Sequence, residues 1–208
     1  GLVKVIMRTE LKMNAIEVIQ QRRATKQFDA GYVMTLDEKK ELLNIALQNA
    51  PSAFNLQHWR PLLIEDRAQR EKIREAAWGQ AQVTDASMLV VLCGDLSSWE
   101  SQVKNICAEA AEPVQQYMVP AVDSYYRGKA QTQRDEIMRS AGIFAQTLML
   151  AAKAHGYDSC PMDGFDFDAV GKIINKPEHY EICLMIAIGK GVSQPYPRIG
   201  KLPFEQIV

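Results

Sequence analysis

Two apolar runs of strand length constrain the fold of this chain more than any other feature. They are ASMLVVLCGD at residues 86–95 and EICLMIAIG at residues 181–189. Their centres contain no polar residue, a pattern typical of central strands that are covered on both faces. A third segment, RPLLIED at residues 60–66, also has strand length. The sequence therefore predicts a sheet with at least two buried central strands.

Capping signals place two helices ahead of the first strand. Asn14 can cap a helix that ends at about Arg22. Thr35 and Glu38 form a capping-box pattern, and the residues behind it supply an apolar helical face until Pro51 stops the helix. The chain is therefore expected to begin with helices.

Four more helices are expected farther along the chain, at residues 69–78, about 97–127, 134–155 and about 166–174. The third is apolar almost all round, which places it in the middle of the molecule, and Gly156 can close it as a left-handed cap. Asp166 or Asp168 can cap the fourth. Because helices come first and a few strands are then mixed with further helices, the predicted fold class is α+β rather than a regular βαβ winding.

Length and composition favour a single domain covering residues 1–208. A chain of 208 residues with 47% apolar residues can bury one real core and has little need of a second. Residues 1–13 match neither a signal sequence nor a core element, so we expect an extra edge segment or an added remnant there. The four cysteines form no CxxC pair and no zinc-type cluster, which predicts reduced thiols, no metal site and a cytoplasmic protein.

Charge and hydropathy argue against two classes of partner. The formal net charge is -1, from 24 basic and 25 acidic residues, so the chain has no overall positive field for nucleic acid. The longest apolar run, residues 143–154, is short and interrupted by polar residues, so it does not predict a membrane span. We therefore expect neither nucleic acid nor membrane as a partner.

Common catalytic motifs are missing from the sequence. It contains no GxGxxG after a strand, no P-loop, no GxSxG and no HExxH. His58, His155 and His179 are scattered near helix ends or turns, and a structural role is the better interpretation of each. The sequence therefore predicts no catalytic triad and no acid pair.

Cationic side chains concentrate in two segments near opposite ends of the chain. Arg22, Arg23 and Lys26 lie in RRATKQF, at a helix end where the helix dipole alone would favour them. Arg198 and Lys201 lie in YPRIGKLP, within a tail whose prolines exclude a helix or a regular strand interior. Because two separate cationic loops can share one phosphate, a phosphorylated ligand is a reasonable hypothesis.

Two further segments stand out for their neutral groups. In PMDGF, residues 161–165, a turn at Gly164 would let a backbone N–H approach a flat ligand, although an ordinary core explains the neighbouring apolar helix equally well. PSAFNLQHW, residues 51–59, follows a helix and carries the amides of Asn55 and Gln57, which an ordinary turn does not require.

Taken in order, RRATKQF, PSAFNLQHW, PMDGF and PRIGKLP resemble the pattern of the FMN-dependent nitroreductase family, and they span residues 22–203. The resemblance implies an α+β fold with a central mixed or antiparallel sheet flanked by helices. It also implies an intertwined homodimer with two FMN sites at the subunit interface. NAD(P)H would leave a hydride on flavin N5, and a nitroaromatic, a quinone or a similar small acceptor would then be reduced in a ping-pong reaction. The flavin carries this chemistry, so no side chain is expected to be catalytic.

The resemblance also implies roles for individual residues. Arg22, Arg23 and Lys26 would hold the phosphate, the ribityl chain and the pyrimidine edge, and Arg198 and Lys201 would complete the phosphate site. The residues implied to reach the cofactor from the partner subunit lie in one loop: Pro51, Ser52, Ala53, Asn55 and Gln57. The residues implied to lie at flavin N5 and along the ring are Pro161, Met162, Asp163 and Gly164.

Several positions depart from the commonest form of the family. Ala24 stands where a serine is usual, so one hydrogen bond to the phosphate or the ribityl chain is expected to be missing, and Ala53 stands where a second serine is frequent. Gly79 and Gln82 stand where the family often has asparagine and lysine. Gln82 can still donate to flavin N1 or O2, but it brings no charge to stabilise a reduced flavin. These departures bear on redox tuning more than on binding.

Three functional hypotheses remain open on the sequence alone. The first is an NAD(P)H-dependent FMN oxidoreductase. The second is a non-catalytic dimer that binds or stores flavin, which Ala24 and Gln82 keep open. The third is a specialised flavin enzyme such as a dehalogenase, which would differ in a substrate lid expected near residues 117–133.

Overall fold

Four antiparallel strands form the sheet of the computed structural model, which describes residues 13–208. The strands are β1 (Trp59–Leu63), β2 (Met88–Asp95), β3 (Asp158–Met162) and β4 (Tyr180–Gly189). Their order in the sheet is β1–β2–β4–β3. The two apolar runs therefore occupy the central positions as predicted, and every residue of β2 is buried.

Helices surround this sheet, and their capping follows the sequence. They are α2 (Ala15–Gln21), α3 (Leu36–Asn49), α4 (Arg67–Ala76), α5 (Gln82–Asp85), α6 (Ser98–Ser101), α7 (Val103–Ile106), α8 (Glu112–Tyr126), α9 (Ala130–Ala154), α10 (Phe167–Ile173) and α11 (Phe204–Ile207), with the short 3-10 helix η1 at Ala53–Asn55. Thr35 forms the predicted capping box of α3, and Asn14, the predicted cap of α2, also forms a capping box. Asp166 caps α10, and Gly156 follows α9 with φ +81°.

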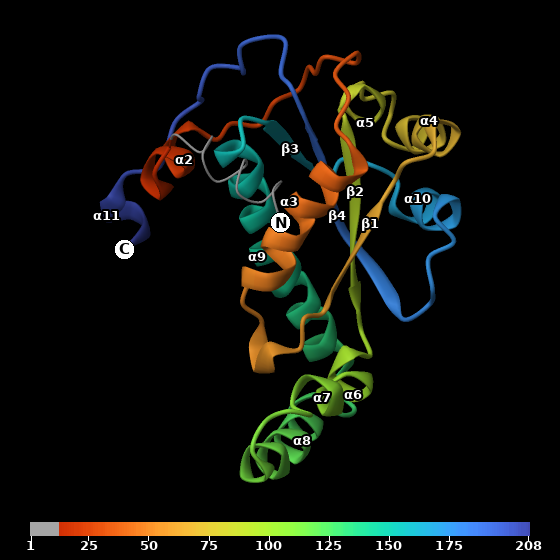
Figure 1. Cartoon of the computed structure of the whole chain (residues 1–208), viewed down its shortest axis with the longest axis vertical. Coiled ribbons are helices and arrows are strands. Elements are labelled where there is room, and N and C mark those ends of the chain that lie inside the picture. The colour runs from red at the N-terminus through yellow and green to blue at the C-terminus, as the bar shows by residue number, and fades with distance from the viewer. Residues whose placement is uncertain (1–12) are drawn as a thin grey trace.

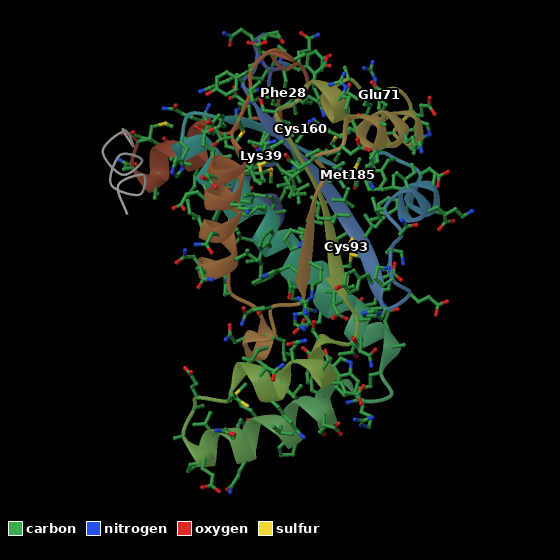
Figure 2. All side chains as sticks on the ribbon, turned by 45° about the vertical axis from the view of Figure 1, so that its right-hand side comes forward. Phe28, Lys39, Glu71, Cys93, Cys160 and Met185 are labelled. Atoms are coloured by element: carbon green, nitrogen blue, oxygen red, sulfur yellow. The ribbon has the colours of Figure 1, made fainter. Side chains whose placement is uncertain are left out.

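The helices form a layer on each face of the sheet (Figure 1). On one face α3 and α9 pack over alternate residues of β2 and β4, including Val90 and Ile186. On the other face, residues of α4, α5 and α10 share a core with the intervening residues, including Val91 and Ala187. Figure 2 shows Phe28 and Cys160 toward one end of the sheet and Cys93 toward the other. Because α9 contacts all four strands, its predicted central place is confirmed.

The region between residues 97 and 127 is not the single long helix that the sequence predicted. It forms α6, α7 and α8, which project at one end of the molecule over a small cluster that includes Leu56, Trp99 and Tyr126 (Figure 1). Proline fits only the first turn of a helix without loss of a backbone hydrogen bond. Pro113 lies in the first turn of α8, which explains why the helix restarts there.

Two other predictions were wrong, and both concern short elements. Pro161 and Met162 are the end of β3 rather than part of a turn, and the turn begins only at Asp163. The proline-rich tail contains the four-residue helix α11, because Pro203 precedes its first turn and therefore does not interrupt it.

The α+β class and the antiparallel form of the sheet are confirmed. Residues 1–12 lie outside the described part, so the expected extra segment at residues 1–13 is not assessed there. Within residues 13–208, no helix has the length and apolar character to cross a membrane.

Candidate functional site

The RRATKQF segment lies along the free edge of β3. Thr25 N donates to Ser159 O at 2.9 Å, and Ala24 pairs with Ser159 in a parallel bridge. Farther along, Phe28 pairs with Gly191, just after β4. Because side chains alternate along an extended segment, Thr25 is buried while Ala24 and Lys26 are exposed. The RRATKQF segment is thus held between the edge of β3 and Gly191, where the C-terminal tail begins.

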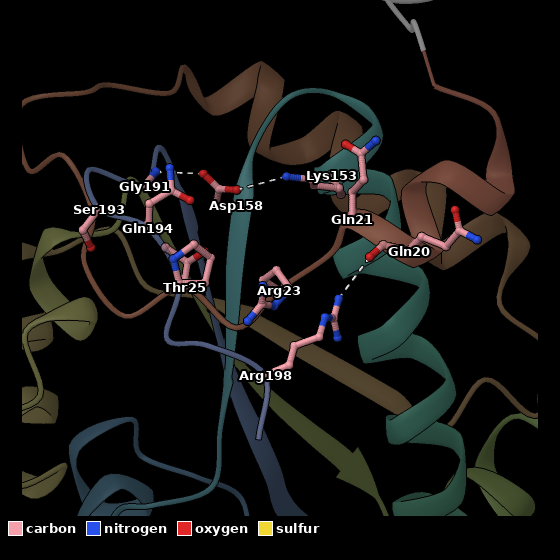
Figure 3. Close-up of a pocket in the computed structure, with 11 residues that line it drawn as sticks. Gln20, Gln21, Arg23, Thr25, Lys153, Asp158, Gly191, Ser193, Gln194 and Arg198 are labelled. Carbon is pink, nitrogen blue, oxygen red and sulfur yellow. Dashed lines mark hydrogen bonds and ion pairs between the residues drawn. The ribbon is translucent and has the colours of Figure 1, made fainter. Parts of the chain in front are cut away.

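A polar cavity of about 550 Å³ opens beside this segment (Figure 3). Its lining residues come from α2, α9, β3, both cationic segments and the start of the tail at residues 191–195: Gln20, Gln21, Arg23, Thr25, Lys153, Asp158, Gly191, Ser193, Gln194, Pro195 and Arg198. Arg23 donates to Tyr196 O, and Arg198 Nη2 donates to Gln20 O at 3.0 Å. Within residues 13–208 neither guanidinium has a carboxylate partner. Both guanidinium groups retain N–H donors that could form hydrogen bonds to an anion.

One carboxylate lies in the same cavity, and this chain already engages both of its oxygens. Asp158 Oδ2 accepts from Gly191 N at 2.9 Å, and Oδ1 lies 3.4 Å from Lys153 Nζ. A side chain at Gly191 would place Cβ 2.9 Å from Asp158 Oδ2 and 3.1 Å from Thr25 Cγ2. The bare backbone of Gly191 therefore lets the tail lie close to the β3 edge.

A second group of candidate residues gathers around Cys160, on the opposite side of β3 from Ser159. Lys26 Nζ lies 3.5 Å from Cys160 Sγ, and Gln82 Nε2 lies 3.9 Å from it. Gln82 also donates to Gln80 Oε1 at 3.2 Å, and Gln80 Nε2 donates to Gly164 O at 2.8 Å. The structure therefore connects the PMDG turn to the RRATKQF segment through two amide side chains and a thiol.

This second group adjoins the first. Lys26 lines a smaller cavity of about 190 Å³, and three tail residues, Ser193, Gln194 and Pro195, line both cavities. At its other end, Met162 is buried while Asp163 is exposed, so the backbone of the turn is accessible. Two predicted cations and the predicted glycine turn thus lie along one edge of the sheet.

Two predicted residues of the cationic segments lie differently. Arg22 is the C-cap of α2, and its Nε is buried without a hydrogen-bond partner in the described residues. Lys201 is exposed and lines none of the described cavities. The structure therefore places Arg23 and Arg198 together, while Lys201 stays apart from them.

The predicted loop at residues 51–57 lies at the other end of the molecule. Figure 1 shows η1 beyond the end of α3, toward α6–α8, whereas α2 and β3 meet at the opposite end. The 14 residues of α3 alone span about 21 Å. One chain therefore does not bring the predicted residues of this loop to the cavity: Pro51, Ser52, Ala53, Asn55 and Gln57.

Hydrogen bonds hold this loop in an unusual backbone conformation. Phe54, Asn55 and Gln57 have φ values of 53°, 56° and 49°, in the left-handed region that non-glycine residues rarely adopt. Ser52 Oγ accepts from Gln57 N at 2.9 Å, and Arg60 Nη1 donates to Gln57 O at 2.7 Å. Such strain is typical of residues that present a fixed shape to a ligand or a partner.

The residues that follow the loop anchor it in the core. Trp59 is 3% exposed and packs against Phe144 with ring centroids 5.2 Å apart. His58 is 2% exposed, and its Nδ1 lies 3.1 Å from Ser140 Oγ. Burial lowers the pKa of His58 to about 4, with the positive charge of Arg60 as a second cause. The interpretation of His58 as structural agrees with this environment.

No sequence motif indicated several of the residues that shape the cavity. Thr25, Lys153 and Asp158 line it, but they belong to three separate elements whose meeting depends on the pairing of β3. Cys160 was interpreted only as a buried thiol, and no motif marked its contacts with Lys26 and Gln82. Among the described residues, no group of His, Cys, Asp and Glu has the arrangement of a metal site.

Comparisons with known proteins agree with this fold. The model of the nitroreductase family matches residues 19–190. Protein DrgA of Synechocystis sp. is 46% identical over 178 residues, which cover 86% of this chain and 84% of DrgA. MhqN of Bacillus subtilis, named as an NAD(P)H nitroreductase, is 32% identical over 92% of this chain and 96% of its own. A protein from Exiguobacterium sibiricum, described as a nitroreductase in complex with FMN, superposes with a TM-score of 0.87 at 28% identity and covers 96% of this chain and 98% of its own.

These matches extend over nearly the whole described chain, and they confirm the expected fold. The residues matched by the family model include RRATKQF and the strands β3 and β4. The chain belongs to the nitroreductase family.

Proposed function

We propose that this protein binds FMN at the β3 edge and transfers reducing equivalents from NAD(P)H to a nitroaromatic, a quinone or a similar small acceptor. The observation that carries the proposal is the cavity where Arg23 and Arg198, from opposite ends of the chain, meet without a carboxylate partner in the described residues. Relatives named as an NAD(P)H nitroreductase and as an NADH dehydrogenase support the reductant. A structural neighbour in complex with FMN supports the cofactor.

The donor groups present fit a flavin nucleotide. Arg22 Nε is a buried donor without a partner in the described residues, as expected of a residue that binds an anionic ligand. Asp158 and Thr25 fill the space that a side chain at Gly191 would need, so the tail backbone stays beside the cavity at the β3 edge. Lys26 Nζ lies 3.5 Å from the thiol of Cys160, and a thiol is a weak acceptor. Arg22 Nε and Lys26 Nζ could therefore donate stronger hydrogen bonds to acceptor atoms of a ligand.

Each segment then has a distinct task. Arg22, Arg23 and Arg198 bind the phosphate, with bidentate contacts that orient it. Lys26 and Gln82 donate to the pyrimidine edge of the ring. Ala24 offers no hydroxyl, so the ribityl chain has one hydrogen bond fewer there.

The PMDG turn lies at the reactive part of the ring. Pro161 and Met162 would border one face of the flavin, and the turn at the exposed Asp163 and the half-buried Gly164 would present backbone toward N5. Bound FMN would supply the redox chemistry, accepting a hydride from NAD(P)H and passing two electrons and a proton to the acceptor. With one further proton from solvent, a quinone becomes a hydroquinone.

A second copy of the chain completes the site. The strained loop of Ser52, Asn55 and Gln57 lies far from the cavity of its own chain, yet it presents polar groups in a fixed conformation. In a homodimer, this loop and Arg60, which holds it, would serve the cofactor of the other subunit. Lys201, on the exposed tail, could join the phosphate site in that assembly.

The absorption spectrum of the purified protein tests cofactor and reaction together. We expect a yellow protein with flavin bands that anaerobic NADH or NADPH bleaches, followed by recovery of the bands when a quinone is added. A bound flavin that neither reductant bleaches would contradict the enzyme and favour a flavin-storage dimer. A colourless protein that gains no thermal stability from added FMN would contradict the cofactor itself.

A further inference from the structure

Trp78 is a large apolar side chain that the fold leaves outside the core. It is 71% exposed, whereas Trp59 and Trp99 are 3% and 7% exposed. An exposed indole contributes little to folding by burial, so packing in the core does not explain a tryptophan at this position.

The backbone at Trp78 is strained and firmly held. The residue follows the end of α4 with φ +57°, a left-handed position where glycine is usual and a bulky side chain is disfavoured. Gly79 N donates to Arg74 O at 2.9 Å, and Arg74 Nε donates back to Gly79 O at 3.0 Å. Arg74 Nη1 also donates to Thr84 Oγ1 at 3.0 Å. These hydrogen bonds hold the backbone next to Trp78, from which the exposed indole projects.

That place is beside the PMDG turn. A Cβ on Gly164 would lie 3.6 Å from Trp78 Cζ3 and 3.7 Å from Gln80 Nε2. Gln80 Nε2 donates to Gly164 O at 2.8 Å, and Gln80 Oε1 accepts from Gln82 Nε2 at 3.2 Å. The indole therefore borders the same turn that the proposed function places at the reactive part of the flavin, next to the group of Lys26, Gln82 and Cys160.

We propose that Trp78 is a side wall of the acceptor site, which stacks against planar aromatic acceptors bound at the PMDG turn and so selects them over non-planar oxidants. This inference rests on the proposed function, because it needs a flavin at that turn. Its basis is physical: an exposed ring that projects from a hydrogen-bonded backbone beside Gly164 gains contact with a flat π-system on stacking. A non-planar oxidant such as the octahedral ferricyanide ion has no flat face against which the indole could stack.

Trp78→Gly separates this role from a structural one. Glycine removes the ring and also relieves the left-handed strain, so thermal stability and FMN content should match or exceed those of the wild type. Duroquinone serves as the planar acceptor, since its methyl groups block addition of thiols, and ferricyanide serves as the non-planar one. We expect the ratio of kcat/KM for duroquinone to kcat/KM for ferricyanide to fall about tenfold in Trp78→Gly. Trp78→Phe, which keeps a flat ring, should restore most of the ratio.

Binding without turnover gives a second measurement. Oxidised holoenzyme without reductant is titrated with duroquinone, and the perturbation of the flavin absorption gives its Kd. The Kd should rise about tenfold in Trp78→Gly and little in Trp78→Phe. An unchanged ratio and Kd in a variant whose flavin NAD(P)H still reduces would overturn the inference alone. A melting temperature that falls together with FMN content would show a structural role and also overturn it, and a wild-type protein without flavin would overturn both this inference and the proposed function.

Discussion

At the scale of single residues, His58 shows how one buried imidazole makes stability depend on pH. Its pKa is about 4 in the folded protein and 6.5 in the unfolded chain. Between these values the unfolded chain binds the extra proton, so stability is lost as the pH falls from 6.5 toward 4. The difference corresponds to about 3 kcal/mol. We expect urea unfolding to show a fall of this size between pH 7 and pH 4 that is absent in His58→Asn.

The matched control for this measurement is the exposed His179. His179→Asn should keep the wild-type fall in the free energy of unfolding, because this change leaves the buried imidazole in place. Asn at position 58 can still bond Ser140, which keeps the variant folded. The same pH dependence in His58→Asn and in the wild type would show that His58 is not the group responsible.

Residue identities in the candidate site were predictable where a short pattern carried them. Arg23 and Arg198 were expected to share a ligand, and they line one cavity. Thr25 and Asp158 were not expected there, because no local pattern reveals which residues a tertiary pairing brings together. Lys201 belongs to an exposed tail, whose position in an isolated chain is set by few contacts.

At the scale of elements, strong periodic signals predicted the structure well and weak ones did not. β2 and β4 are long apolar strands, and α3 carries a capping box, so each was recognised from local sequence. β3 has five residues, DSCPM, with a proline and no apolar alternation, and it becomes a strand because β4 offers it an edge. The split of residues 97–127 into α6, α7 and α8 depends on Pro113 and on the small cluster beneath.

The amides of the loop at residues 51–57 are expected to contribute to FMN binding. The double variant Asn55→Ala and Gln57→Ala removes both amides but keeps Leu56, His58 and Trp59 buried in place. We expect the Kd for FMN, measured by quenching of flavin fluorescence, to rise at least about tenfold through the loss of two hydrogen bonds. The circular dichroism spectrum should remain that of the wild type.

A neighbouring amide provides the comparison for the loop variant. Asn49 closes α3 just before the loop, and its Nδ2 donates only within its own helix, to Ile45 O at 2.8 Å. Asn49→Ala should therefore leave the Kd for FMN within about twofold of the wild type. Equal weakening in both variants would mean that the loop acts through the stability of α3 and not through contact with the cofactor.

At the scale of the whole molecule, the separation between the loop and the cavity makes a specific prediction about assembly. One loop variant (Asn55→Ala with Gln57→Ala) and one cavity variant (Arg23→Ala with Lys26→Ala) should each retain little FMN as homodimers. In a mixed dimer, the intact loop of the cavity variant meets the intact cavity of the loop variant, while the other site carries both defects. If sites form between subunits, mixed dimers isolated with two affinity tags should regain one tightly bound FMN for every two chains. If each site forms within one chain, every site in the mixed dimer keeps a defect and no binding returns, which would contradict the shared site.

The same mixed dimer also tests the chemistry. NADH should bleach the regained flavin, and the mixed dimer should show half of the wild-type kcat per dimer. The stoichiometry of binding therefore distinguishes an interface site from two independent ones without any knowledge of the natural acceptor.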